Sequence, residues 1–170
     1  PALTELSLGS WEITLTAESR AALGRLNQLH SLRLGDNPLQ LTPDVTGWQH
    51  LHTLDLDRVG ITQWPEGLPG LMNQRPLVLR SLDLSGNRLV NAPELHDTAF
   101  AEAIRNGDEG TYYDFDDNPF SEQAQRSLFG AGLTAIPDMD ALEDEAWVIE
   151  LPPALEAHRE ANAEDAEWAP

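Results

Sequence analysis

The chain has 170 residues, with 29 acidic and 10 basic side chains, a formal net charge of −19 and no cysteine. This length suits a single domain, which can bury a core without a disulfide or a metal. Without cysteine, the chain cannot perform thiol catalysis or hold zinc through thiolates. The negative charge would repel a phosphate backbone or an anionic bilayer, so we expect neither nucleic acid nor a membrane as a partner.

The two ends of the chain point to a longer parent protein. Residues 138–170 contain eleven acidic residues and one arginine, so about half of the net charge lies in this segment. Such a run is typical of a solvated segment. We therefore expect an acidic tail, or a linker to a missing downstream domain, over residues 138–170. Because the chain starts with Pro1 rather than methionine, we expect the parent to continue at both ends.

Five segments of the chain share one spacing of apolar residues. Residues 79–89 fit the pattern L-x-x-L-x-L-x-x-N-x-L at every fixed position, and the segment that begins at Leu29 fits it as well. The segments that begin at Leu3 and Leu51 have another residue in place of the asparagine. In a fifth segment, which begins at Gly110, aromatic residues replace leucines. Such self-similarity is the signature of a repeat architecture.

The repeat resembles that of the leucine-rich-repeat family over residues 3–120. In an L-x-L strand the leucines point to one face and the residues between them to the other. The resemblance implies an α/β solenoid of five repeats, with a short parallel sheet on the concave side and an irregular or helical convex side. We assign the repeats to residues 1–120 and a C-terminal capping helix to residues 121–137.

The outer side of the longer repeats has room for helices. We expect a helix over residues 16–26, with Thr16 as its N-cap and with Ala22, Leu23 and Leu26 facing inward. The corresponding stretches of the next two repeats contain too many prolines and glycines for a long helix.

Two further helices are expected later in the chain. The first covers residues 97–105, with Asp97 as its N-cap and with Asn106 and Gly107 at its end. The second covers residues 121–130, with Gly130 as its stop, and we expect it to close the C-terminal end of the solenoid.

Three asparagines occupy the fixed polar position of the repeat, at residues 37, 87 and 118. An asparagine side chain can satisfy backbone groups where a coil leaves the sheet, so we expect a structural role for all three. Trp11 and Val59 stand at this position in the other two repeats. We expect Trp11 to cover an end of the stack, and the coils of Trp11 and Val59 to be the looser ones.

The residues between the leucines form the candidate partner-binding surface, because the concave face is the usual binding surface of the family. One outward column contains Ser7, Arg33, Asp55, Asp83 and Asp114. The full set of candidate partner-binding residues is Arg33, His52, Asp55, Asp57, Arg80, Asp83, Tyr112, Asp114 and Asp116.

The acidic column leaves two interpretations open. Carboxylates on neighbouring strands repel each other unless a positive charge compensates. A basic segment of a partner protein could supply that charge. Alternatively, Arg33, Arg58 and Arg80 neutralise the column within the fold, and the face binds nothing. Tyr112 is the best single anchor for a partner, because amphipathic aromatic residues contribute strongly to interfaces.

Motifs for catalysis and for metal binding are missing or incomplete. Residues 114–118 resemble the start of a calcium loop, but Pro119 and Gln125 stand where such a loop needs glycine and glutamate. The chain has no Ser–His–Asp order, nucleophile elbow or glycine-rich phosphate loop. We therefore expect no catalytic residue, no metal and no cofactor, and we predict that the chain is not an enzyme.

The repeat at residues 79–89 is followed by the proline-containing turn Val-Asn-Ala-Pro-Glu, and residues 118–128 read Asn-Pro-Phe-Ser-Glu-Gln-Ala-Gln-Arg-Ser-Leu. With these motifs, residues 79–137 resemble the closing repeat and capping helix of bacterial novel-E3-ligase effectors. The resemblance implies that the chain is a noncatalytic substrate-recognition region whose ligase cysteine lies beyond it. The partner would then be a host protein, and the parent would be secreted into a host cell. In the alternative function, the repeats form a structural spacer without a ligand on the concave face; location in the bacterial cytoplasm also stays open.

Overall fold

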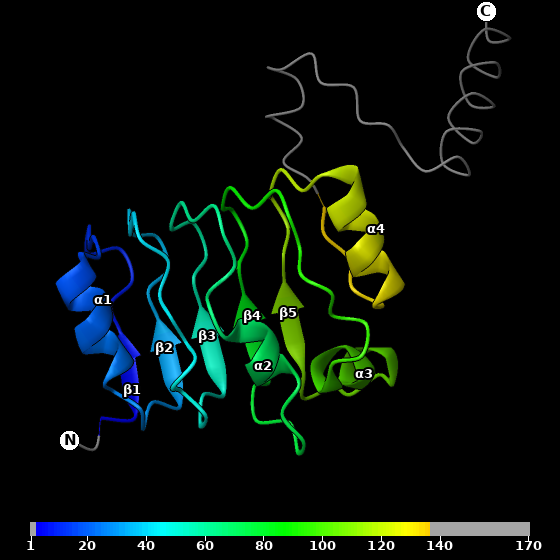
Figure 1. Ribbon diagram of the computed structural model, residues 1–170, viewed down its shortest axis with the longest axis horizontal. Coiled ribbons are helices and arrows are strands. Elements are labelled where there is room, and N and C mark those ends of the chain that lie inside the picture. The colour runs from blue at the N-terminus through cyan, green and yellow to red at the C-terminus, as the bar shows by residue number, and fades with distance from the viewer. Residues whose placement is uncertain (1–2, 137–170) are drawn as a thin grey trace, which may run out of the picture. The chain divides into compact units, whose positions relative to one another are not determined.

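The computed structural model describes residues 3–136, so the expected acidic tail lies outside the described residues. Five short strands form one parallel sheet, in which their order follows the chain (Figure 1). The strands are β1 (Glu5–Ser7), β2 (Ser31–Arg33), β3 (Thr53–Asp55), β4 (Ser81–Asp83) and β5 (Tyr112–Asp114). This arrangement agrees with the α/β repeat fold expected from the spacing of the leucines.

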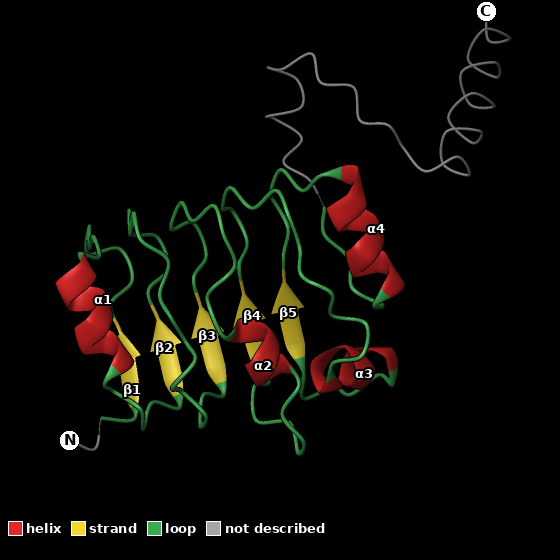
Figure 2. Ribbon diagram, viewed as in Figure 1, coloured by secondary structure: helices red, strands yellow, loops and turns green. Residues whose placement is uncertain are grey.

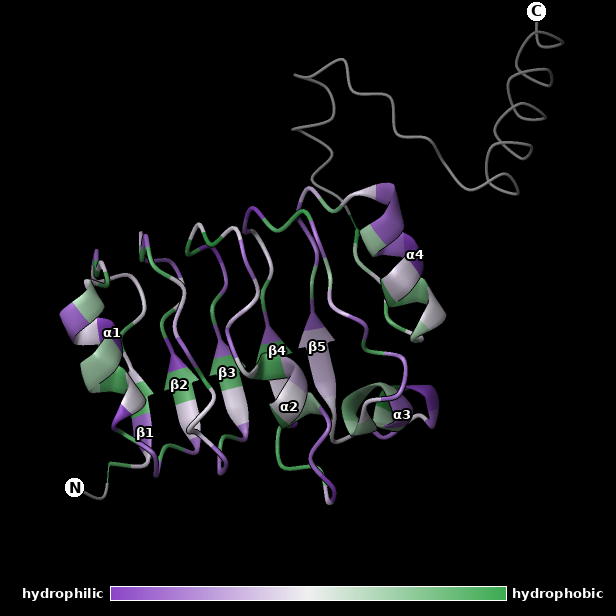
Figure 3. Cartoon of the chain, in the orientation of Figure 1, coloured by the Kyte–Doolittle hydropathy of each residue, from purple (hydrophilic) through white to green (hydrophobic). Residues whose placement is uncertain are grey.

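The register of the sheet places equivalent residues of the five repeats side by side. Leu32 pairs with Leu54 and Leu54 with Leu82, and Tyr113 takes the same position on β5. Leu54, Leu82 and Phe115 are 0% exposed. Figure 3 shows a hydrophobic centre and a hydrophilic C-terminal tip in each of β2, β3 and β4. The predicted alternation of buried leucines and outward polar residues is therefore confirmed for β2, β3 and β4. In the first repeat it is only partly met, because Leu3 is 42% exposed and Leu6 is half-buried.

In the described part of the chain, four helices lie between or after the strands (Figure 2). They are α1 (Ala17–Gly24), α2 (Leu68–Met72), α3 (Ala99–Arg105) and α4 (Glu122–Gly130). The side chain of Thr16 caps α1 as predicted, and it does so in a capping box with Ser19. Leu23 and Leu26 pack against the core. The inward placement of Ala22 was wrong, because this residue is exposed.

The ends of α3 and α4 differ in detail from the prediction. Thr98, rather than Asp97, caps α3, since its hydroxyl accepts the Ala101 N–H at 3.2 Å. Ser121, the first residue of the predicted helix, is the N-cap of α4 rather than part of it. Its left-handed glycine is Gly132 (φ 86°) rather than Gly130. Ala124 and Leu128 anchor α4 in the hydrophobic core.

The asparagines of the repeat tie neighbouring coils together. The side-chain oxygen of Asn87 accepts the N–H groups of Val59 and Gly60, both at 2.9 Å. Its nitrogen donates to the carbonyls of Leu56 at 2.8 Å and Leu84 at 2.9 Å. Asn37 and Asn118 make equivalent bonds to the coil before each of them. The predicted structural role is therefore confirmed for all three.

The two turns without an asparagine of their own are still bonded by asparagine, because the next coil supplies it. Each asparagine bonds the preceding coil, and the turns of Trp11 and Val59 therefore receive bonds from Asn37 and Asn87. Because Val59 has no amide group, no asparagine side chain among the described residues joins the coil of Val59 to the coil before it. There the Leu39 N–H donates to the backbone carbonyl of Val59 at 3.3 Å. Trp11 does not cover an end, because it is 72% exposed.

One residue in each coil adopts a left-handed backbone conformation just after its strand. The φ angles at this position lie between 51° and 67°. Only Gly86 is a glycine, and a Cβ atom there would lie 2.5 Å from the Cγ atom of Arg58. The five residues are Ser10, Asp36, Arg58, Gly86 and Asp117. The geometry serves a repeated bond, in which the N–H of this residue donates to a carbonyl of the next coil or, for the last, of Ile136.

We predict that the substitution Asn87→Ala destabilises the fold by about 2–4 kcal/mol, because it leaves several buried backbone groups without a partner. Urea unfolding followed by tryptophan fluorescence measures this loss. Asn91→Ala is the matched control: Asn91 is exposed, and only its backbone carbonyl accepts a bond, from Trp64. Equal unfolding midpoints for the two variants would contradict a structural role for the Asn87 side chain.

Candidate functional site

The register brings one outward residue of each strand into a row across the sheet. Ser7 pairs with Arg33, Arg33 with Asp55, Asp55 with Asp83 and Asp83 with Asp114. We call these five residues the outward row. Arg33 is exposed, whereas the three aspartates are half-buried. The structure therefore places the predicted column on one face, as the sequence pattern indicated.

Each aspartate of the outward row also holds the turn after its strand. One carboxylate oxygen of Asp55 accepts the N–H of Asp57 at 3.1 Å, and that of Asp83 accepts the N–H of Ser85 at 2.9 Å. Asp114 accepts the N–H of Asp116 in the same way at 2.9 Å. These Asx turns need a short acidic or amide side chain two residues before the donor. The spacing D-x-[DS] in three consecutive repeats was a signal for them that sequence reasoning missed.

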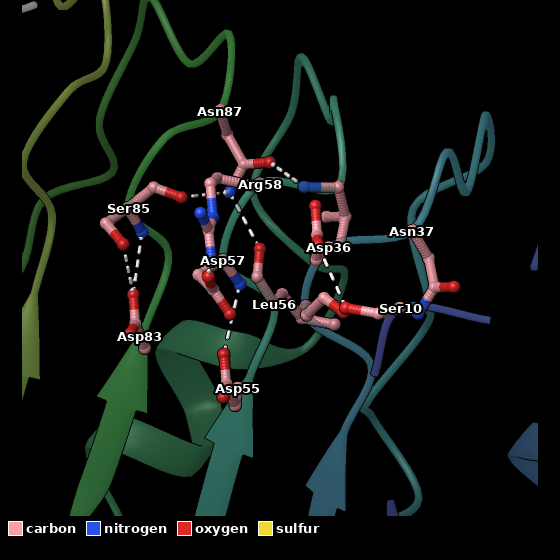
Figure 4. A network of polar contacts seen from close by, with 12 residues as sticks. Ser10, Asp36, Asn37, Asp55, Leu56, Asp57, Arg58, Asp83, Ser85 and Asn87 are labelled. Carbon is pink, nitrogen blue, oxygen red and sulfur yellow. Dashed lines mark hydrogen bonds and ion pairs between the residues drawn. The ribbon is translucent and has the colours of Figure 1, made fainter. Parts of the chain in front are cut away.

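Three carboxylates gather where β3 and β4 end, and Figure 4 shows them from close by. Oxygen atoms of Asp55, Asp57 and Asp83 all lie within 4.8 Å of one another. Gly35 makes room for this group: a Cβ atom there would lie 2.0 Å from an oxygen of Asp57. Three oxygens at such distances could hold a divalent cation or receive a guanidinium or ammonium group.

The crowding of carboxylates changes their acidity. Burial, a hydrogen bond to Asp57 and the charges of Asp57 and Asp83 raise the pKa of Asp55 to about 7. Burial and the same repulsion, from Asp83 and Asp116, also raise the pKa of Asp114. Like charges close together favour the neutral, protonated form of a carboxyl group, which is why its pKa rises.

The arginines do not neutralise the outward row as the second interpretation required. Arg58 pairs with Asp57 at 3.0 Å. Arg80 turns to Asp108 at 2.6 Å and also donates to the hydroxyl of Thr111. Within residues 3–136, Arg33 makes no ion pair. Within residues 3–136, no ion pair therefore joins an arginine to Asp55, Asp83 or Asp114, although the charge of Arg58 still interacts with that of Asp55.

The other candidate residues surround the row. Tyr112 is 54% exposed on β5, and burial and the charge of Asp114 raise its pKa. His52 is exposed beside the strands, and one of its ring nitrogens lies 3.1 Å from the hydroxyl of Thr53. Asp116 accepts the N–H of Ile136 at 2.8 Å, so it also holds the segment that follows α4.

A groove that the sequence did not reveal lies between the start of β4 and helix α3. It has a volume of about 360 Å³, and its lining includes Arg75, Leu77, Arg80, Ala99, Glu102 and Asp108. Arg75 pairs with Glu102 at 2.7 Å, as Arg80 does with Asp108. Because the charges in the groove compensate one another, the outward row offers the stronger electrostatic attraction.

Comparison with known proteins identifies one part of the chain. Residues 78–98, which contain β4 and the asparagine turn after it, match the Leucine Rich Repeat family. No curated protein and no solved structure matches the chain. The family match supports a leucine-rich repeat, and leucine-rich repeats commonly bind other proteins. Within residues 3–136, no helix is long and apolar enough to cross a membrane.

We predict that Asp55→Asn stabilises the protein more at pH 8 than at pH 5. The pKa of Asp55 is about 7 in the folded state, above the value of about 3.9 expected in the unfolded state. The proton therefore stabilises the fold at low pH, and this contribution is lost as the pH rises through 7. Asparagine cannot ionise and can donate to Asp57 at both pH values.

Thermal unfolding followed by circular dichroism at the two pH values measures this effect. Glu94→Gln is the control, because Glu94 is exposed and makes no ion pair within residues 3–136. An unchanged difference in Tm between Asp55→Asn and the wild type at pH 5 and pH 8 would contradict the raised pKa.

Proposed function

We propose that this chain is a noncatalytic protein-binding module that presents the outward face of its sheet to a basic segment of a partner protein. The observation that carries the proposal is the row Asp55, Asp83 and Asp114 on adjacent strands, to which no arginine of residues 3–136 is paired. Polar side chains on the same face supply further contacts, chiefly Arg33, His52 and Tyr112.

The energetics favour binding over an inert face. A repulsive row costs stability in the free protein, because each carboxylate is partly desolvated near another. A basic partner segment removes that cost and gains charge-assisted hydrogen bonds with the outer carboxylate oxygens. In the competing proposal the repeats only space or shield neighbouring domains, and the same row is then an uncompensated feature of a solvated surface.

We also propose a shape for the repeat stack and a parent protein for the chain. We infer a curved stack whose concave side is the binding face and whose C-terminal end is closed by α4. Ala124 and Leu128 support this role for the helix. The resemblance of residues 79–137 to bacterial novel-E3-ligase effectors supports a parent that is secreted into a host cell, where this module selects a host protein for ubiquitin transfer.

Replacing Asp55, Asp83 and Asp114 together by serine should weaken capture of basic proteins from a host lysate at low salt by at least tenfold. Several charged contacts are lost at once, and the wild type should also lose capture as salt is raised. Quantitative pull-down over a salt series measures both effects.

The matched control replaces three exposed acids outside the face, Glu18, Glu94 and Glu109, by serine. It changes the net charge equally and should leave capture nearly intact. Equal capture by the wild type and by both triple variants would favour the spacer function.

The effector proposal makes a separate prediction about the parent gene. Because this chain contains no cysteine, the ligase nucleophile must lie in a following domain. We expect a cysteine-containing domain downstream, and the parent protein should form a thioester with ubiquitin that dithiothreitol cleaves. A parent that ends at this module, or a downstream domain without cysteine, would overturn the ligase assignment without touching the binding proposal.

A further inference from the structure

The outward row changes sign between β2 and β3. Arg33 is exposed on β2, and the next three positions of the row are acidic. On the other side of Arg33, strand β1 carries Glu5, which pairs with Ser31, two residues before Arg33 on the same face of the sheet. Among the ion pairs within residues 3–136, none joins Arg33 to Glu5 or to Asp55.

We infer that the partner segment is itself bipolar. It is an extended peptide with one acidic side chain that contacts Arg33 and basic side chains two and four residues away that contact Asp55, Asp83 and Asp114. This inference rests on the proposed function and narrows it, because a uniformly basic segment would place a cation against Arg33.

The spacing of the row matches that of an extended peptide. Neighbouring strands are about 4.8 Å apart, so Arg33 and Asp114 are separated by three strand spacings, or about 14 Å. Side chains on one face of an extended peptide recur every two residues, about 6.6 Å apart, so residues i and i+4 are about 13 Å apart. Residue i then lies over Arg33, and residue i+4 over Asp114.

Residues i+2 and i+4 of the peptide contact different groups of the protein. Residue i+2 lies between Asp55 and Asp83, where three carboxylate oxygens including that of Asp57 lie within 4.8 Å of one another. Residue i+4 meets Asp114 and the ring of Tyr112, which is 54% exposed on the same strand. An aromatic ring beside a carboxylate attracts a guanidinium through both its face and the neighbouring charge.

Of the three arginines Arg33, Arg58 and Arg80, only Arg33 makes no ion pair within residues 3–136, so it is the anchor for the acidic side chain. Arg58 is occupied by Asp57 and Arg80 by Asp108. An acidic side chain displaced by one strand would face Asp55 instead of Arg33. Charge complementarity therefore fixes the register of the segment as well as its composition.

Fluorescence anisotropy with short labelled peptides tests the inference. One peptide carries glutamate at one position and arginine two and four positions further on, with alanine between them. A second replaces the glutamate by glutamine, and a third and fourth repeat the pair in the reverse order, because the spacing fits either chain direction. We expect the wild type to bind the glutamate peptide of at least one order about two- to fivefold more tightly than its glutamine counterpart.

Two variants separate the role of Arg33 from a general effect of charge. Arg33→Ser should abolish the preference for glutamate. Arg88→Ser, which removes an exposed arginine that lies outside the row, should preserve it. Circular dichroism of each variant confirms that the fold is intact.

The possible results distinguish this inference from the proposed function. Equal affinity for the glutamate and glutamine peptides in both orders would overturn the inference, as would a preference that survives Arg33→Ser. If the glutamine peptides bind and lose affinity in Asp83→Ser and Asp114→Ser, the face binds basic segments and only the bipolar register is wrong. If no peptide binds, the bipolar register is also wrong, and the triple-serine pull-down decides the proposed function separately.

Discussion

Stacking in register is the constraint on which the rest of this structure depends. Each strand has only three residues, and so short a strand is stable only where neighbours share its hydrogen bonds and bury its side chains. Buried leucines at equivalent positions and the amide groups of Asn37, Asn87 and Asn118 enforce the same register in successive coils. A slip by one residue would exchange the buried leucines for the outward polar residues.

The binding face is a direct product of that register. Because each coil contributes one residue at the same height, the charges of Arg33, Asp55, Asp83 and Asp114 form a line rather than a scattered set. The aspartates serve two purposes there. One oxygen of each holds the backbone turn, and the carboxylate as a whole charges the surface. A glutamate would reach the turn less well, which gives a physical reason for the shorter acid at these positions.

Sequence reasoning found the repeat, the five strands and their pairing, because a period-2 pattern of leucines determines which face is buried. The sequence pattern could not predict which acidic residue a long arginine side chain would contact in the folded chain. Arg80 pairs with Asp108, 28 residues away, and not with an aspartate of the outward row. The residue types in the row could not show which acid Arg80 would choose. Adjacent cap residues such as Asp97 and Thr98 were equally ambiguous, since both side chains can accept an N–H of the first turn.

The left-handed residue after each strand has a consequence for how this surface can change. In four of the five coils a residue with a Cβ atom occupies this conformation, which costs roughly 1 kcal/mol where glycine would cost little. The fold therefore operates below the stability that its own backbone permits. Glycine at these left-handed positions, which lie outside the outward row, would recover part of this lost stability. The added stability would tolerate substitutions in the outward row that change specificity and weaken the fold. Adaptation to a new partner would then be limited by charge geometry rather than by thermodynamic tolerance.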